Sequence, residues 1–149
     1  MLLVCSTGGH LLQLAALRPA WDHLSRAWVT FDKSDARSIL SDERVLFAHG
    51  PTNRNVPNLV RNLVLAWRVV RRLRPSVVIS TGAGVAVPFA WIARLHGATI
   101  VYVESFTRID RPSLSFRLLR PVTNRTYAQW PELAERTGAR YVGNLFLRA

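Results

Sequence analysis

Residues 2–16 read LLVCSTGGHLLQLAA, an apolar run that ends at two glycines and is followed by apolar residues with helical spacing. A short, continuous apolar run is typical of a buried parallel strand, so the sequence predicts a strand at its start. Two glycines after a strand favour a tight turn, and the spacing of the following leucines indicates a helix. This stretch therefore has the pattern that opens a β-α-β unit.

The same alternation of apolar runs and helical segments continues through all 149 residues, a length that fits about one domain. It predicts an α/β fold with a Rossmann-like, doubly wound and mainly parallel sheet, formed by a single domain over residues 1–149. The predicted strands are residues 2–5, 26–31, 45–48, 76–80, 99–103, 125–128 and 140–142, and the predicted helices are residues 9–20, 34–41, 57–73, 85–96, 113–120 and 131–137.

A second glycine loop, with the sequence STGAG at residues 80–84, follows the fourth predicted strand. In the strand order 3-2-1-4-5, strands one and four lie on either side of the point where the order reverses, so both glycine loops should face one crevice. Backbone N–H groups at such turns can bind anions, although each loop could also be only a tight turn. We predict an acceptor- or phosphate-binding site formed by Thr7, Gly8, Gly9, Thr81, Gly82, Gly84, Ser105 and Arg108.

Two titratable side chains are expected at the same edge of the sheet. His10 lies just inside the first predicted helix, and Glu104 follows the fifth predicted strand. Either could remove a proton from a bound hydroxyl, so we predict both as catalytic residues. The alternatives are that His10 only covers the helix end and that Glu104 forms a salt bridge to Arg108. With Cys5 as the single cysteine, no intramolecular disulfide or cysteine-based zinc site can form, and no metal is predicted.

The chain is strongly basic, with 20 Lys and Arg residues against 9 Asp and Glu residues and a formal net charge of +11. Its partner should therefore be anionic: nucleic acid, a membrane surface or a phosphorylated substrate. The sequence shows neither a signal-peptide pattern nor an uncharged run of about 18 residues, so membrane contact is expected to be peripheral. We expect a cytoplasmic protein at the inner face of the cell membrane.

Two segments could contact an anionic membrane. In the first, Arg111, Arg117 and Arg120 flank Phe116, so guanidinium groups could bind lipid phosphates while the ring enters the interface. The second is the helix predicted at residues 57–73, which is amphipathic and basic. We expect this helix to cover the sheet with the stripe of Leu59, Leu63, Trp67 or Ala66, Val70 and Leu73, and to place Arg61, Arg68 and Arg72 opposite.

Four motifs carry a family resemblance: CSTGGHL at residues 5–11, ISTGAGVAVP at 79–88, VESFTR at 103–108 and YVGNLF at 141–146. With these motifs the chain closely resembles the acceptor-side subunit of split, two-chain glycosyltransferases, the PssD and CpsF type of bacterial capsule and exopolysaccharide synthesis. That type is related to the eukaryotic subunit that anchors the dolichol-linked UDP-GlcNAc transferase, and to the N-terminal half of MurG-like GT-B enzymes.

The resemblance implies the N-terminal half of a GT-B fold and a separate donor-binding subunit of the PssE or CpsG type. It implies transfer of a sugar from a UDP-sugar to a polyprenyl-pyrophosphate-linked acceptor, with no cofactor. In this comparison the Gly8-Gly9-His10 loop matches the acceptor-side glycine loop of MurG-like enzymes. Glu104 matches the acid of their His-Glu-Gln-Asn motif, with Val103 at the histidine position.

Two other classes of protein share some of these features. Asp32 lies 24 residues after Gly8, near the spacing of a ribose-binding acid in a dinucleotide-dependent oxidoreductase. However, the first loop lacks the Gly-x-Gly-x-x-Gly pattern, and the second has Val87 where the third glycine belongs. A nucleic-acid-binding module would suit the charge, but neither a helix-turn-helix nor a zinc pattern occurs. We therefore expect no nucleic-acid partner.

Overall fold

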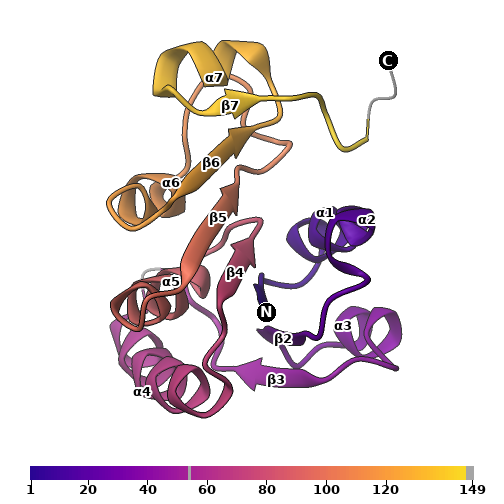
Figure 1. The fold of residues 1–149 in the computed structure, drawn as a ribbon, viewed down its shortest axis with the longest axis vertical. Coiled ribbons are helices and arrows are strands. Elements are labelled where there is room, and N and C mark those ends of the chain that lie inside the picture. The colour runs from indigo at the N-terminus through magenta and orange to yellow at the C-terminus, as the bar shows by residue number, and fades with distance from the viewer. Residues whose placement is uncertain (54, 147–149) are drawn as a thin grey trace.

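The computed structural model describes residues 1–53 and 55–146, and in this part of the chain it contains seven strands and seven helices (Figure 1). All strand pairs are parallel, in the order β3-β2-β1-β4-β5-β6-β7. This confirms the predicted doubly wound sheet, with its order reversing between β1 and β4. The strands are β1 (Leu2–Val4), β2 (Ala27–Phe31), β3 (Val45–Ala48), β4 (Val77–Ser80), β5 (Thr99–Val103), β6 (Arg125–Ala128) and β7 (Arg140–Tyr141).

The helices cover the two faces of this sheet (Figure 1). Helices α1, α2 and α3 lie on one face, and α4, α5 and α6 form a layer on the other, with α7 beside β6 and β7. One predicted helix, residues 9–20, is instead two helices with a break at Leu17. Pro19 explains the break, because proline inside a continuous helix removes an N–H donor and clashes with the preceding turn. The helices are α1 (Gly9–Ala16), α2 (Arg18–Trp21), α3 (Ser34–Ile39), α4 (Val56–Leu73), α5 (Ala86–Leu95), α6 (Leu114–Leu119) and α7 (Pro131–Thr137).

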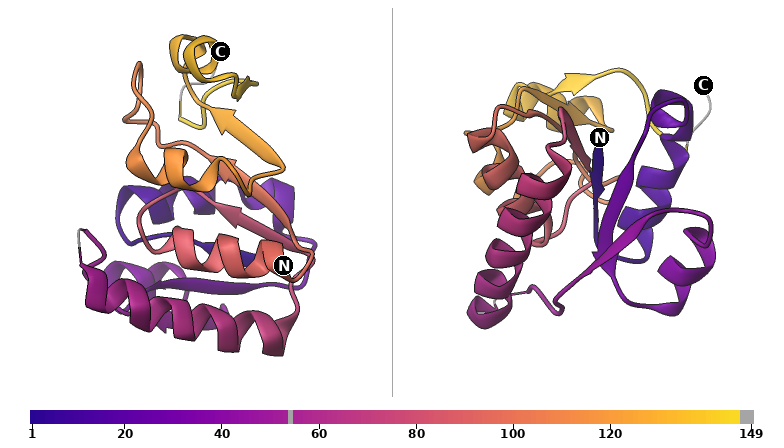
Figure 2. Two further views of the ribbon diagram at one scale, coloured as in Figure 1. Left: turned by 90° about the vertical axis from the view of Figure 1, so that its left-hand side faces the viewer. Right: turned by 60° about the horizontal axis from the view of Figure 1, so that its bottom comes forward.

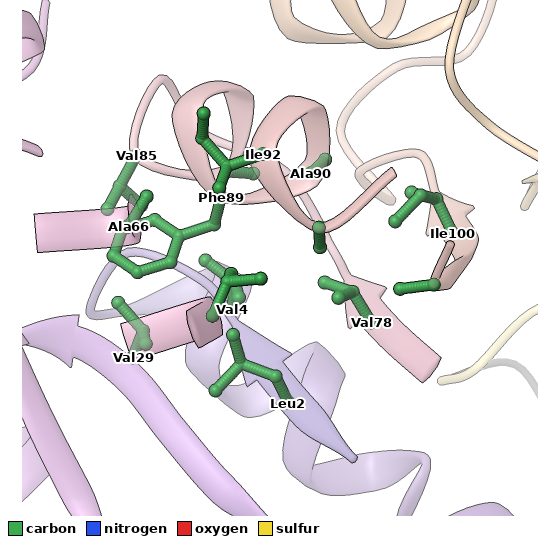
Figure 3. Packing of buried hydrophobic residues seen from close by; sticks show 14 of the residues in the cluster. Leu2, Val4, Val29, Ala66, Val78, Val85, Phe89, Ala90, Ile92 and Ile100 are labelled. Carbon is green, nitrogen blue, oxygen red and sulfur yellow. The ribbon is translucent and has the colours of Figure 1, made fainter. Parts of the chain in front are cut away.

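Alternating residues of the central strands pack on opposite faces of the sheet. Leu2 and Val4 of β1 face α5 and contribute to a cluster around Phe89 (Figure 3). Leu3, together with Cys5 directly after the strand, belongs to a second cluster with α1 and α2. This alternation follows from the two-residue period of a strand. Because the strands are parallel, their carboxyl ends lie at one edge of the sheet.

Helix α4 buries only part of the stripe predicted to cover the sheet: Ala66 and Val70 are buried and Leu73 packs against the same core cluster. Leu59, Leu63 and Trp67 are 44–45% exposed, which corrects the expectation that they cover the sheet. Two asparagines lie inside because they bind the loop before the helix. Asn62 accepts from the His49 N–H and donates to the His49 carbonyl, each at 2.8 Å, and Asn58 donates to the Pro51 carbonyl at 2.9 Å. The residues of α4 that are buried are Asn58, Asn62, Ala66, Val69 and Val70.

Candidate functional site

A cavity of about 930 Å³ opens at the carboxyl ends of β1 to β4. This is the edge of a doubly wound sheet at which ligands bind. Its walls come from the loops that follow these four strands and from the first turn of α6. Thr7 and Gly84 are the two predicted site residues that line it. The lining residues are Ser6, Thr7, Phe31, Asp32, Lys33, Ala48, Gly50, Pro51, Thr52, Asn53, Ala83, Gly84, Leu114 and Ser115.

The two glycine loops meet beside this cavity, as expected from the strand order. The Thr81 hydroxyl donates to the His10 carbonyl oxygen at 2.7 Å, and His10 Nδ1 lies 2.7 Å from the Thr81 carbonyl oxygen. A carbonyl oxygen can only accept, so Nδ1 carries the hydrogen in this bond. In the neutral ring, Nε2 is then the nitrogen with a free lone pair. His10 therefore has the tautomer that a general base needs.

Gly82 allows this close approach of the two loops. Its φ is +116°, a conformation that other residues rarely adopt. A Cβ at this position would lie 3.0 Å from His10 Cε1 and 3.1 Å from the Tyr102 hydroxyl. A larger residue would therefore both strain the backbone and displace the imidazole. The glycine is required here for the position of His10.

The first glycine loop is already bonded to a carboxylate. The Gly8 N–H donates to Asp35 Oδ2 at 2.7 Å, so a group of α3 occupies the donor that was expected to face a phosphate. Asp32 also lines the cavity, and the Arg37 guanidinium, 2.6 Å away, holds the pKa of that carboxyl below its usual value. Carboxylates accept hydrogen bonds from sugar hydroxyls. With Asp32 paired to Arg37 and Lys33 also in the lining, this part of the cavity offers polar groups to a sugar without a net formal charge.

Glu104 is fully buried beneath the loop that follows β5. One oxygen, Oε1, accepts from the Ser105 N–H at 2.8 Å and from the Tyr102 hydroxyl at 3.2 Å, while Oε2 accepts from the Ser113 N–H at 2.9 Å. Burial, together with the Glu104 carboxylate, raises the pKa of Tyr102 above its usual range, so the phenol keeps its proton. In the described part of the chain, no ion pair joins Glu104 to the exposed Arg108. Glu104 thus holds both ends of the loop from Ser105 to Ser113.

Two buried glutamines, missed in the sequence, connect this loop to the rest of the site. Gln129 donates to Gln13 Oε1 at 2.7 Å and to the Glu104 carbonyl at 3.0 Å, and Gln13 donates to the Gly9 carbonyl at 3.0 Å. The same Gln129 accepts from the Leu145 N–H at 3.2 Å. Their positions in the sequence could have indicated them. Gln13 interrupts an apolar helix face, and Gln129 directly follows β6, at the ligand-binding edge of the sheet.

Phe116 is not placed as predicted for membrane contact. It is 3% exposed and packs edge-on against Tyr102, with ring centroids 6.0 Å apart, so the expectation that its ring enters a membrane interface is wrong. Phe116 is buried because residues three apart lie on the same face of a helix, and Phe116 and Leu119 both face the core. Around them, Arg111, Arg117 and Arg120 are exposed.

Within residues 1–53 and 55–146, no group of three or more His, Cys, Asp or Glu side chains is placed to hold a metal ion.

Five of the predicted site residues form two groups. His10, Thr81 and Gly82 meet at the junction of the glycine loops, and Glu104 and Ser105 anchor the neighbouring loop.

Residues 44–145 match the family described as "Oligosaccharide biosynthesis protein Alg14 like". Two relatives named UDP-N-acetylglucosamine transferase subunit ALG14 are similar in sequence. The one from Candida albicans is 31% identical over 53% of this chain and 39% of its own length, and the one from Mus musculus is 26% identical over 91% of this chain and 77% of its own length. This chain therefore spans well under half of the Candida relative.

The structure of MurG from Acinetobacter baumannii superposes with a TM-score of 0.70 at 18% identity, over 88% of this chain and 42% of the MurG chain. At this identity the likeness concerns the fold, which is that of the N-terminal half of a GT-B glycosyltransferase.

Proposed function

Because the chain belongs to the Alg14-like family of oligosaccharide biosynthesis proteins, we propose that it is the acceptor-side subunit of a two-chain glycosyltransferase. The enzyme would transfer a sugar from a UDP-sugar to a polyprenyl-pyrophosphate-linked acceptor, in the manner of PssD- and CpsF-type subunits of bacterial polysaccharide synthesis. The relatives named as subunits of a UDP-N-acetylglucosamine transferase support this proposal. The reaction as proposed uses no metal and no cofactor other than the UDP-sugar substrate.

The observation that carries the proposal is the bond from His10 Nδ1 to the Thr81 carbonyl oxygen, at the junction of the two glycine loops whose Thr7 and Gly84 line the cavity. In the proposed reaction, an acceptor sugar lies in the cavity and its hydroxyl approaches Nε2 of His10. Nε2 takes the hydroxyl proton as the oxygen attacks the anomeric carbon of the donor sugar. The bond from that carbon to the UDP oxygen breaks, and UDP leaves with the electron pair. Glu104 takes part as a positioning residue, since its oxygens hold the loop that follows β5.

The donor-binding partner, a subunit of the PssE or CpsG type, would dock beside residues 141–146. Tyr141, Val142 and Phe146 are 47%, 79% and 49% exposed, an unusual group of large apolar side chains for a free surface. The Phe146 ring packs against Phe106 at 5.6 Å, in the loop held by Glu104. A partner on this surface would therefore contact the loop that leads into α6, whose Leu114 and Ser115 line the cavity.

We expect sugar transfer when this chain is mixed with its donor-binding partner, UDP-N-acetylglucosamine and a lipid-linked acceptor, and none from the chain alone. Val142→Asp should weaken copurification of the pair by ~10-fold, because it places a charge in an apolar contact. Leu95→Asp, at a comparably exposed position at the end of α5, serves as the control. Full turnover by the pure chain, or equal copurification of both variants, would contradict the proposal.

We also propose peripheral attachment to the cytoplasmic face of the membrane, through α4 rather than through the predicted segment of residues 111–120. Helices α4, α5 and α6 lie side by side in one layer (Figure 2, left). On α4, apolar side chains are exposed next to arginines, as in helices that lie in a membrane interface. Within residues 1–53 and 55–146, none of the helices combines the length and the hydrophobicity that a membrane span requires. The exposed apolar residues of α4 are Val56, Leu59, Val60, Leu63, Val64 and Trp67, and its arginines include Arg61, Arg68, Arg71 and Arg72.

Replacing Leu63 and Trp67 together with glutamine should lower binding to phosphatidylglycerol vesicles by ~10- to 100-fold, since two apolar side chains no longer enter the interface. The matched control is Leu12→Gln with Leu24→Gln, two side chains of similar exposure away from α4. Cosedimentation measures both variants. If the control pair loses as much binding as the α4 pair, α4 is not the attachment surface.

A further inference from the structure

A second hollow, of about 580 Å³, lies between α6 and α7 and contains an unusual concentration of arginine. We call it the arginine groove. Its four arginines and one aspartate give a formal charge of +3 (4 − 1). Arg111, Arg117 and Arg120 come from residues 111–120, and α7 contributes the fourth, Arg136. The lining residues are Asp110, Arg111, Pro112, Phe116, Arg117, Arg120, Arg136 and Thr137.

This charge is hardly neutralised within the protein. The groove's ion pair joins Arg111 to Asp110 at 3.7 Å, with side chains 82% and 60% exposed, a geometry that contributes little stability. Arg117, Arg120 and Arg136 form no ion pair in the described part of the chain. By contrast, Arg26 outside the groove forms a close and largely buried ion pair with Glu43, at 2.6 Å.

Four guanidinium groups around one hollow indicate a ligand with several negative oxygens. Arginine stays protonated at all relevant pH values, so the groups repel one another unless an anion lies among them. The planar guanidinium also forms paired hydrogen bonds to phosphate oxygens. A concave site with donors from two helices suits a compact diphosphate better than a flat charged surface does.

The groove adjoins the acceptor cavity across one turn of helix. Leu114 and Ser115 line the cavity, whereas Pro112, Phe116 and Arg117 line the groove, so the first turn of α6 separates the two. A ligand that crosses this turn could place a sugar in one and a phosphate in the other. The groove has a formal charge of +3, whereas Asp32 and Lys33, the charged residues that line the cavity, cancel each other, so the groove is the more favourable place for negative charge.

We propose that the arginine groove binds a pyrophosphate group. The identification of this group as the pyrophosphate of the lipid-linked acceptor rests on the proposed function. The acceptor would then lie with its sugar in the cavity and its pyrophosphate between Arg117, Arg120 and Arg136, which fixes the sugar hydroxyl relative to His10.

The test uses the chain alone and inorganic pyrophosphate, with binding measured by titration calorimetry at constant ionic strength. Arg120→Gln with Arg136→Gln should weaken binding by ~10- to 100-fold, because two charged donors are lost. The control pair, Arg44→Gln with Arg140→Gln, removes the same charge from exposed positions outside the groove and should change binding less than about 3-fold. The single variant Arg117→Gln gives an independent reading if the double variant folds poorly.

The proposal would be overturned in favour of nonspecific charge attraction if the groove and control double variants weaken pyrophosphate binding equally. It would also be overturned if the parent chain binds sulfate as tightly as pyrophosphate. A second measurement uses phosphatidylglycerol vesicles. If the double variant Arg120→Gln with Arg136→Gln loses vesicle binding but keeps pyrophosphate binding, the site binds a lipid headgroup and the proposal is wrong. Neither measurement needs the donor, the partner or turnover, so a failure of the proposed transferase activity stays distinguishable from a failure of this site.

Discussion

Replacing His10 with alanine is expected to lower turnover of the reconstituted two-chain enzyme by ~10²- to 10⁴-fold, the usual contribution of a general base. The physical reason is the bond from Nδ1 to the Thr81 carbonyl, which leaves Nε2 to accept the proton. Steady-state kinetics with saturating donor measure the effect. Stability should change little, because the side chain is only half-buried.

His10→Asn separates the catalytic role of this residue from its structural role. The asparagine amide can still donate to the Thr81 carbonyl, but it offers no basic nitrogen in place of Nε2. It should therefore be as inactive as the alanine variant while holding the two loops together. His23→Ala, at an exposed position, is the control. Turnover near the parent's in a folded His10→Asn protein would assign the base to another residue or to the partner.

Glu104→Ala is expected to lower the free energy of unfolding by about 2–6 kcal/mol. The substitution leaves the buried N–H of Ser105 and that of Ser113 without their acceptor, and each orphaned donor costs about 1–3 kcal/mol. Urea denaturation measures the loss, with Glu135→Ala on the exposed face of α7 as the control.

The milder Glu104→Gln variant tests whether this residue is a base. Its amide oxygen can replace one carboxylate oxygen, but its NH₂ group must face a backbone donor, so stability should fall while the loop remains in place. If Glu104 only positions the loop, turnover of the folded variant should stay within ~10-fold of the parent. A loss of more than ~100-fold without a loss of stability would instead make Glu104 the catalytic base.

The β/α alternation, the strand order and the meeting of the two glycine loops could all be predicted from the sequence. These features depend on local properties, namely the length and periodicity of apolar runs and the glycines at strand ends. The topology then follows from the few ways in which parallel strands can be connected. His10 could be predicted at the ligand edge because it directly follows the first strand and its glycine turn.

Only the tertiary structure decided which helix faces are buried and which polar groups are satisfied inside. Helix α4 has enough apolar residues for two stripes, and the need of the His49 backbone for a hydrogen-bond partner placed Asn62 inside and Trp67 outside. The enclosure of Glu104 likewise depends on the N–H of Ser113, nine residues away. Arg136 joins Arg120 in one groove because α6 and α7 border the same hollow. Such contacts join residues that lie apart in sequence, so no local pattern contains them.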